Sequence, residues 1–451
     1  MDGSVRISVP PGAERVIGTL RSAGYEAFAV GGCVRDSLLG REPQDWDVTT
    51  SARPEQVKAL FPRTVDTGLQ HGTVTVMQGR EGYEVTTYRI DGEYEDGRHP
   101  KGVTFTPNLE EDLKRRDFTI NAMAYNRERG LVDPFGGMED LKAGVIRCVG
   151  EPEERFGEDA LRMLRAVRFS AQLGYAIEDA TGRAIRKLSG TLVRVSAERI
   201  QAELVKVMLS PHPDRLRQAY ELGITKVFLP EFDRAMETPQ KHPHHRYSVG
   251  EHILHSLTAV RADRVLRLSM LFHDIGKPET LTVDEQGITH FHGHAARSAE
   301  MAVQILRRLK FDNDTVDKVR CLVTYHDYGN DADPDLRMVR RAVNKIGEGA
   351  FPALFEVKEA DLCAQSGYLQ QEKERRLEKW RELYAQMREK DQCVSLKSLA
   401  VTGSDLIAAG MKPGREIGVV LQKLLELVLD DPACNTRERL LKEAEKLAEI
   451  A

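Results

Sequence analysis

The sequence changes its pattern near residue 150, and this change constrains the fold more than any other feature. Before it, short runs rich in β-branched and apolar residues predict strands at 27–30, 74–76 and 84–90. The polar segment 91–108, rich in turn formers, is predicted to be a loop. From about Glu151 onwards, apolar residues recur at helical spacing, as at Leu161, Leu164 and Val167. We therefore expect a mixed α/β part followed by helical parts.

The composition argues against several classes of protein. With 41% hydrophobic and 30% charged residues, a chain of 451 residues can fill several cores. No apolar run reaches the length of a membrane span, and the first residues lack the features of a signal peptide. The six cysteines are far apart and form no CxxC pair, which fits a reducing cytoplasm and argues against a cysteine zinc site. Because the net charge is −5, any RNA-binding surface must be local.

A glycine pair and a carboxylate pair mark the first candidate site. Gly31 and Gly32 follow the strand at 27–30 and precede a helical run, so the backbone there can approach a phosphate closely. Arg35, in the first turns of that helix, can reach the same phosphate. Asp45 and Asp47 are two apart on a predicted strand, so both face one side, as needed to hold a divalent metal ion beside a triphosphate. Either pair alone is more often a turn or a solvated strand edge, but their order and spacing together favour nucleotidyl transfer.

With these motifs the sequence resembles the polymerase-β-like nucleotidyltransferases, and more closely the bacterial class II family of tRNA nucleotidyltransferases and poly(A) polymerases. The segment RRDFTINAMA at 115–124 is similar to the family's second motif, which contacts the ribose. Asp117 and Asn121 are four apart on a predicted helix and would share a face, where they can hydrogen-bond a 2′-hydroxyl, and Arg116 can meet a phosphate. Without the family, an Arg–Asp pair and a helix-capping Asn explain these residues equally well.

The segment EDALRMLRAVRF at 158–169 is predicted to be a helix with one apolar and one charged face. Taken alone, this pattern is typical of a helix with solvated arginines. The resemblance implies that Asp159 and Arg162 act as a protein template for the incoming C or A, because an Arg offers two donors and an Asp two acceptors. It also implies that Arg165 and Arg168 contact the nucleotide.

Two segments favour the CCA-adding members of the family. Residues 67–87 resemble the CCA-adding version of the head, and the loop at 89–100 has its full length, whereas members that add only CC tend to have a shorter one. Residues 401–435 resemble the carboxy-terminal segment that holds tRNA in the family. There, Lys412, Arg415 and the helix start after Pro413-Gly414 suit backbone phosphates. A plain helix-turn-helix is the alternative for this last segment.

Histidines crowd the middle of the chain, where ten of the thirteen fall between 242 and 326. Four residues resemble the ligand series of an HD phosphohydrolase domain: His252, His273, Asp274 and Asp361. Such a set brings a divalent or transition metal ion to a water molecule and lowers the pKa of that water. His294 and His326 can hold a second ion, and purely structural histidines are the alternative. Five further histidines receive no role from the pattern: His242, His244, His245, His255 and His290.

The resemblance covers nearly the whole chain and implies a multidomain α/β plus α fold. Its parts are a nucleotidyltransferase head (1–148), a helical base-selecting neck (149–208), a helical body (209–370) with the HD domain at about 242–365, and a helical tRNA-binding tail (371–451). The implied activity is stepwise transfer of CMP, CMP and AMP from CTP and ATP to tRNA, with Asp45 and Asp47 as the catalytic residues that hold Mg²⁺. The alternatives are a poly(A) polymerase or partial CC- or A-adding enzyme, and a metal-dependent phosphohydrolase acting on RNA ends. A cytoplasmic location is expected, and neither a membrane nor a protein partner is implied.

Overall fold

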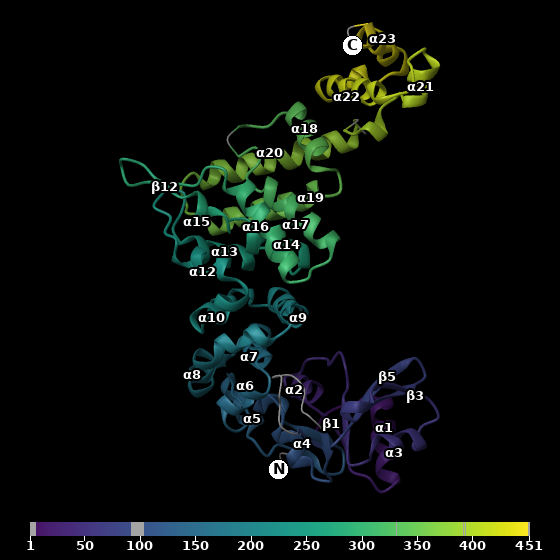
Figure 1. Ribbon diagram of the computed structural model, residues 1–451, viewed down its shortest axis with the longest axis vertical. Helices are drawn as coiled ribbons and strands as arrows, with labels where there is room; N and C mark the ends of the chain where they lie inside the picture. Colours follow the sequence, from purple (N-terminus) through teal and green to yellow (C-terminus); the bar gives the residue numbers. More distant parts are fainter. Residues whose placement is uncertain (1–5, 92–102, 331, 391, 393, 450–451) are drawn as a thin grey trace. The chain divides into compact units, whose positions relative to one another are not determined.

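The computed structural model describes residues 6–91, 103–330, 332–390, 392 and 394–449. The chain forms two compact units, Met1–Pro230 and Glu231–Ala451, which are considered separately (Figure 1). A mixed α/β head and a helical remainder are both present, as predicted. Within the described residues, no helix is long and apolar enough to cross a membrane. The finer division into four domains stays a prediction.

A seven-stranded mixed sheet lies at the centre of the head, in the order β3-β4-β5-β2-β1-β8-β9. Its strands are β1 (Ala27–Val30), β2 (Val48–Thr50), β3 (Thr64–Gly68), β4 (Thr73–Gln78), β5 (Glu81–Thr87), β8 (Ala124–Asn126) and β9 (Gly130–Val132). β2 pairs antiparallel with β1 and in parallel with β5. The residues that lead into β2 and β5 therefore lie side by side at one end of the sheet.

The head also contains five α-helices, α1 (Pro11–Ser22), α2 (Gly32–Leu38), α3 (Pro54–Leu60), α4 (Leu109–Lys114) and α5 (Gly137–Ala143), of which α1, α2 and α3 contact strands of this sheet. Phe28 and Val30 of β1 are buried in one cluster with Tyr88 and with Leu113 of α4. This burial explains why the apolar run at 27–30 forms a central strand.

The predicted loop at 91–108 is wrong where β6 (Arg89–Asp91) pairs with β7 (Val103–Phe105). Cross-strand pairing fixes these residues, although turn formers dominate the segment between them. Residues 92–102 lie outside the described part of the chain, and so does most of the full-length loop predicted at 89–100.

After the head, the first unit is mainly helical. It contains α6 (Pro152–Glu158), α7 (Leu161–Leu173), α8 (Asp179–Leu188), α9 (Ala197–Met208), α10 (Leu216–Glu221) and α11 (Thr225–Phe228). The predicted stripe of Leu161, Leu164 and Val167 is buried on α7, which packs against α9. A short parallel ladder of β10 (Val145–Ile146) and β11 (Ala176–Ile177) is an exception to the helical prediction.

In the described residues of the second unit, all named elements are helical apart from one hairpin, β12 (Thr282–Val283) and β13 (Thr289–His290). Its helices are α12 (Pro230–Glu237), α13 (Val249–Ala259), α14 (Arg264–Phe272), α15 (Lys277–Thr280), α16 (His294–Arg308), α17 (Asn313–Tyr325), α18 (Leu336–Ile346), α19 (Phe351–Ala364), α20 (Gln370–Glu389), α21 (Gly403–Ala408), α22 (Arg415–Asp430) and α23 (Arg437–Glu449). α13, α14, α16, α17 and α19 pack on one another. The charged helix predicted at 370–390 and the break at Lys412-Pro413-Gly414 are confirmed.

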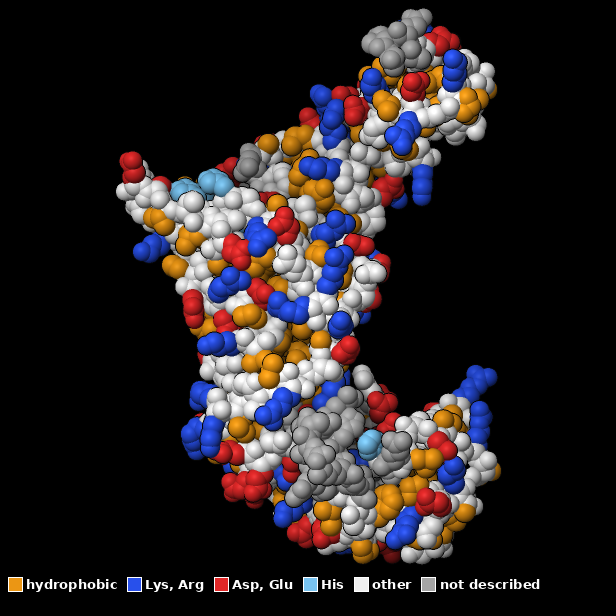
Figure 2. Space-filling view, in the orientation of Figure 1, with side chains coloured by type: hydrophobic (Ala, Val, Ile, Leu, Met, Phe, Trp, Pro, Cys, Tyr) orange, Lys and Arg blue, Asp and Glu red, His pale blue; other side chains and the backbone are white. Residues whose placement is uncertain are grey.

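Acidic and basic side chains are interspersed over both units on the face drawn in Figure 2. This distribution agrees with the small net charge of −5. It also agrees with the expectation that any contact with RNA is local.

Candidate functional site

β1 ends in a glycine turn that leads into α2. Gly31 has a φ of 79°, in the left-handed region that favours glycine. A Cβ atom at Gly31 would lie 2.9 Å from Nη1 of Arg116, so a side chain there would displace the guanidinium. Glycine is therefore needed at this position both for the turn and for the close approach of Arg116, the predicted phosphate ligand.

Asp45 and Asp47 are exposed and lie immediately before β2, rather than on a strand as predicted. The backbone N–H of Val30 donates to the carbonyl of Asp47 (3.0 Å), which holds Asp47 beside the end of β1. Partial desolvation and the nearby carboxylates of Glu84 and Asp45 raise the pKa of Asp47, while Arg116 opposes this shift. A divalent cation would relieve this repulsion, so the residues present fit the predicted Mg²⁺.

Glu84 is a third carboxylate at this site, and sequence reasoning missed it. Because β2 and β5 are parallel with Val48 opposite Val85, Glu84 lies next to Asp47. Along β5, Val85 is buried and Glu84 is exposed. The alternation in EVTTYRI indicates which face Glu84 takes, but only the strand pairing shows that Asp47 is its neighbour.

Arg35 is buried and begins a row of hydrogen bonds through the head and α7. Its Nη1 donates to Oδ1 of Asn121 (2.7 Å), whose Nδ2 donates to Oδ1 of Asp117 (3.2 Å). Nη2 of Arg165 lies 2.6 Å from Oδ2 of Asp117. Burial alone would raise the pKa of Asp117, but Arg165 and Asn121 lower it to about 2, so this carboxylate is ionised. The structure thus joins residues from three separate motifs.

Asp117 and Asn121 contact each other without sharing an α-helix. α4 ends at Lys114, Phe118 forms an isolated β-bridge with Cys148, and Asn121 ends a 3-10 helix. The predicted helix is therefore wrong here, because a tertiary pairing of the backbone at Phe118 overrides the helical spacing. The contact that the helix was meant to explain is nevertheless present.

Asp159 lies in a break between α6 and α7, with a φ of −145°, and not within one helix as predicted. Its Oδ1 accepts a hydrogen bond from the N–H of Leu161 (3.0 Å), and its Oδ2 pairs with Nη2 of Arg199 (2.6 Å). Arg162 pairs with Glu158 and donates to two backbone carbonyls. The two predicted template residues are thus held by separate partners. Arg199 was missed because it comes from α9, forty residues further along the chain.

Arg168, another predicted nucleotide ligand, is buried and only 8% exposed. Its Nε lies 2.8 Å from Oε2 of Glu203, and its guanidinium covers the ring of Phe169 at 4.0 Å. Burial and the neighbouring Arg165 lower the pKa of Arg168 to about 10, so the side chain remains charged at neutral pH. Its contact with a nucleotide stays a prediction, as do the roles of the other site residues.

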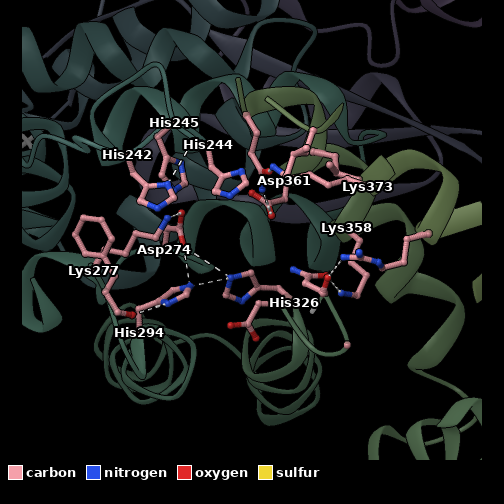
Figure 3. A pocket seen from close by; sticks show the side chains of 18 of the residues that line it. His242, His244, His245, Asp274, Lys277, His294, His326, Lys358, Asp361 and Lys373 are labelled. Atoms are coloured by element: carbon pink, nitrogen blue, oxygen red, sulfur yellow. Dashed lines mark hydrogen bonds and ion pairs between the residues drawn. The ribbon is translucent and has the colours of Figure 1, made fainter. Parts of the chain in front are cut away.

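In the second unit, the predicted histidines and aspartates converge on a buried cluster (Figure 3). Among the described residues, two groups have ligand geometry: His252, His273 and Asp274, and Asp274, His294 and His326. In the first group, Nε2 of His252 lies 3.1 Å from Nε2 of His273 and 2.9 Å from Oδ1 of Asp361. In the second, Nε2 of His294 lies 3.2 Å from Nε2 of His326 and 3.3 Å from Oδ1 of Asp274. Asp274 lies between the groups.

The orientation of the four rings fits metal ions. The Nδ1 atoms of His252, His273, His294 and His326 contact the backbone carbonyls of Ala364 (3.2 Å), Met270 (2.8 Å), Phe291 (2.9 Å) and Val323 (2.8 Å), respectively. Because a carbonyl only accepts, each Nδ1 carries the proton, and each Nε2 of a neutral ring turns a lone pair toward the cluster. Oδ1 of Asp274 is buried without a hydrogen-bond partner, whereas Oδ2 forms an ion pair with Nζ of Lys277 at 2.6 Å. Facing lone pairs and an unsatisfied carboxylate oxygen are stabilised by a cation between them.

A pocket of about 620 Å³ opens beside the cluster (Figure 3). Its lining includes Lys277, Lys358, Lys373, Phe291 and Trp380. It also includes histidines to which the sequence pattern assigned no role, namely His242, His244, His245 and His290. The ring of His242 stacks on that of His244, with centroids 4.9 Å apart. The tertiary fold brings these rings to the pocket, so the spacing of these histidines along the chain did not predict that they line it.

Three family models match the chain. They are described as a poly A polymerase head domain (residues 27–147), a probable RNA and SrmB-binding site of polymerase A (174–236) and a putative tRNA nucleotidyltransferase domain 2 (279–444). Together they match most of residues 1–148, part of residues 149–208 and most of the second unit.

Named relatives are similar over nearly the whole length. The CCA-adding enzyme of Lactobacillus helveticus (strain DPC 4571) is 37% identical, with 96% of each chain covered. That of Pediococcus pentosaceus is 35% identical, with 96% of this chain and 97% of the other covered. Among solved structures, the Bacillus stearothermophilus CCA-adding enzyme in complex with CTP has a TM-score of 0.73 and 31% identity, with 98% of this chain and 99% of that chain covered. The Thermotoga maritima CCA-adding enzyme complexed with tRNA, at 22% identity and a TM-score of 0.60 over 98% of this chain and 97% of that chain, shares the fold.

Proposed function

We infer that this chain, which belongs to the family of CCA-adding enzymes and poly(A) polymerases, transfers CMP, CMP and AMP from CTP and ATP to the 3′ end of tRNA. The observation that carries this proposal is the group of carboxylates Asp45, Asp47 and Glu84 beside Arg116, in a head that matches the family model. Full-length likeness to several CCA-adding enzymes supports the choice over a poly(A) polymerase.

The reaction forms a bond between the tRNA 3′-oxygen and the α-phosphorus, and breaks the bond between that phosphorus and the pyrophosphate. The 3′-hydroxyl loses its proton, and pyrophosphate leaves with the displaced electron pair. Asp45, Asp47 and Glu84 would hold Mg²⁺, which lowers the pKa of the hydroxyl and neutralises charge on the leaving group. Arg116, whose guanidinium lies close to Gly31, would neutralise a phosphate there.

Base selection is assigned to Asp159 and Arg162. An Asp offers acceptors and an Arg offers donors, so the pair can meet the hydrogen-bonding edge of C or A. Arg199 is proposed to position Asp159, because its guanidinium occupies one carboxylate oxygen at 2.6 Å. Arg35, Asn121, Asp117 and Arg165 would hold the ribose and phosphates through their shared hydrogen bonds. Lys412 and Arg415, both exposed beside the start of α22, are proposed contacts for the tRNA backbone.

A direct test incubates the purified chain with tRNA lacking CCA, with CTP and ATP separately and together. Addition of two cytidines and one adenosine is expected, and long adenosine tails or a stop after CC would refute the assignment. Asp47→Asn and Glu84→Gln should abolish addition while tRNA binding is kept. Glu81→Gln, on the same strand, is the matched control and should be fully active.

A second function is supported by the buried cluster in the second unit. The four Nε2 atoms directed at Asp274 and Asp361 would hold one or two divalent ions, which supply a metal-activated water for phosphoester hydrolysis. In that reaction the water oxygen bonds to phosphorus, the ester oxygen leaves, and a proton passes from the water to the leaving oxygen. Metal-loaded protein should hydrolyse a phosphoester on an RNA end or nucleotide.

This second function is tested by metal content and hydrolysis together. His273→Gln and His294→Gln should lose both, whereas His255→Gln, on the same helix as His252, should keep both. Hydrolysis that persists in His273→Gln would overturn the proposal. Both functions fit a cytoplasmic protein, where tRNA ends are processed and free thiols such as the five described here persist.

A further inference from the structure

A row of hydrogen bonds leads from the histidine–aspartate cluster to Lys373 (Figure 3). Nε2 of Gln365 donates to Oδ2 of Asp361 (2.9 Å), and Oε1 of the same amide accepts from Nζ of Lys373 (2.7 Å). Asp361 lies on α19, Gln365 follows the last residue of that helix, and Lys373 lies near the start of α20. Both distances are those of well-formed hydrogen bonds, so this row, termed the relay below, joins the cluster to a second helix.

The two carboxylate oxygens of Asp361 have different neighbours. Oδ1 lies 2.9 Å from Nε2 of His252 and 3.7 Å from Nε2 of His273, so an ion held by those two rings would meet this oxygen. Oδ2 accepts from the amide of Gln365. A carboxylate that binds an ion is held in its orientation by such a second hydrogen bond. The amide of Gln365 therefore fixes which oxygen of Asp361 faces the cluster.

The amide of Gln365 is oriented by the groups on both of its sides. The ammonium group of Lys373 has donors only, so it selects the amide oxygen. The carboxylate of Asp361 has acceptors only, so it selects the amide NH₂ group. A reversed amide would bring two oxygens together at Asp361 and two donors together at Lys373. The lysine thus favours the one orientation that supports Asp361.

The connection between the two helices places Lys373. α20 packs on α19, and Leu369, which precedes α20, has a φ of 54°, in the left-handed region that residues with a side chain rarely adopt. The N–H of Lys373 donates to the carbonyl of Leu369 (3.1 Å). Lys373 is partly buried, and burial lowers its pKa while the charge of Asp361 opposes that shift. The ammonium group therefore lies within the electrostatic field of the cluster.

We propose that Lys373 is a positioning residue for the metal cluster, which acts through Gln365 to keep Oδ1 of Asp361 directed at the ion. The proposal rests on the second function above, and it adds a residue that controls ion affinity from another helix. A positive charge that acted directly on the cluster would weaken ion binding by repulsion. The relay strengthens it instead, so the two roles predict opposite changes when the ammonium group is removed.

The test measures the Kd of Mn²⁺, Co²⁺, Ni²⁺ and Zn²⁺ for the full chain by calorimetry, together with the visible absorption spectrum of bound Co²⁺. The variants are Lys373→Met, which keeps the side-chain length without a donor, Gln365→Met, and the two combined. Lys373→Arg keeps both charge and donors and should restore the relay. Lys379→Met, exposed on the same helix, is the matched control, and circular dichroism checks that every variant is folded.

Ion binding should weaken in both single variants. Gln365→Met should raise the Kd roughly 10- to 100-fold, as is typical when a metal ligand loses its outer hydrogen-bond partner, and Lys373→Met roughly 3- to 30-fold, because the amide keeps one of its two partners. The combined variant should match Gln365→Met within about twofold, since the lysine acts through the amide. Both single variants should alter the Co²⁺ spectrum, whereas Lys373→Arg and Lys379→Met should resemble the native protein.

Two results would overturn the proposal while the second function stands. One is unchanged or tighter ion binding in Lys373→Met, and the other is a combined variant whose loss equals the two single losses added together. A native chain that binds none of the four ions would refute the second function and this proposal with it. The affinity of the native chain therefore separates the two kinds of failure.

Discussion

The ion pair between Arg199 and Asp159 offers the sharpest test of how this chain selects a base. Arg199→Met keeps most of the side-chain length but removes the guanidinium that lies 2.6 Å from Oδ2 of Asp159. A charge-assisted hydrogen bond contributes about 1.5–3 kcal/mol, and both side chains here keep some solvent exposure, so about 1–2 kcal/mol is expected. In this variant the N–H of Leu161 still donates to Oδ1 of Asp159. The Asp159 carboxylate should therefore stay at its position but no longer be held in one orientation.

The assay is kcat/KM for CTP and ATP against UTP and GTP, on tRNA substrates that end before each position. Arg199→Met should lower kcat/KM for the correct nucleotides roughly 5- to 30-fold, with a smaller change for the incorrect ones, so that discrimination falls. Arg194→Met, exposed just before the same helix, is the control and should resemble the native protein. An equal loss for all four nucleotides, or no loss, would refute the positioning role.

Three further outcomes follow from the structure. Gly31→Ala should lower the free energy of unfolding by roughly 1–2 kcal/mol, because φ at this position is 79°. Nucleotide addition should fall far more, because the new Cβ displaces Arg116. Parallel measurements of melting and activity check this, and normal activity would contradict it. Asp117→Asn should cost up to about 2 kcal/mol at neutral pH. Since the pKa of Asp117 falls from 3.8 to about 2 on folding, the stability difference from the native protein should be full above pH 4 and shrink as pH falls toward 2, and a difference that grows in acid would be inconsistent with the ion pair to Arg165. Metal at one hundred times its Kd should stabilise the second unit by about 2.7 kcal/mol, a gain that a chelator reverses and that His273→Gln lacks; equal melting with and without metal would count against the cluster as a metal centre.

Local sequence was enough for features that depend on neighbouring residues. The apolar run at 27–30, the turn at Gly31 and the buried stripe of α7 each reflect packing or φ requirements of their own segment. The series from His252 to Asp361 was recognisable because an adjacent His and Asp after an apolar helix is an uncommon combination. In these cases the structure realised the pattern that the residues predicted.

Features that depend on contacts between residues far apart in the chain could not be predicted from the sequence. Glu84 becomes part of the carboxylate group only through the parallel pairing of β2 and β5. Asp159 lies outside the helix that its spacing predicted. There, Arg199 from α9 and the N–H of Leu161 hold its carboxylate. Lys373 reaches the pocket because α20 packs on α19, which a charged helix pattern does not indicate. Each requires a contact between segments that no local periodicity encodes.

The rings of the histidine cluster differ in how mutation can disturb them. His273, His294 and His326 are each oriented by the carbonyl three residues earlier in the chain, a group that no side-chain substitution removes. His252 instead relies on the carbonyl of Ala364, more than one hundred residues away on α19. Sequence drift in the core that shifts α13 against α19 would therefore misalign His252 first. The ion site shared by His294 and His326 should therefore tolerate substitutions in the core better than the site that includes His252. During divergence of the sequence, it should be retained for longer.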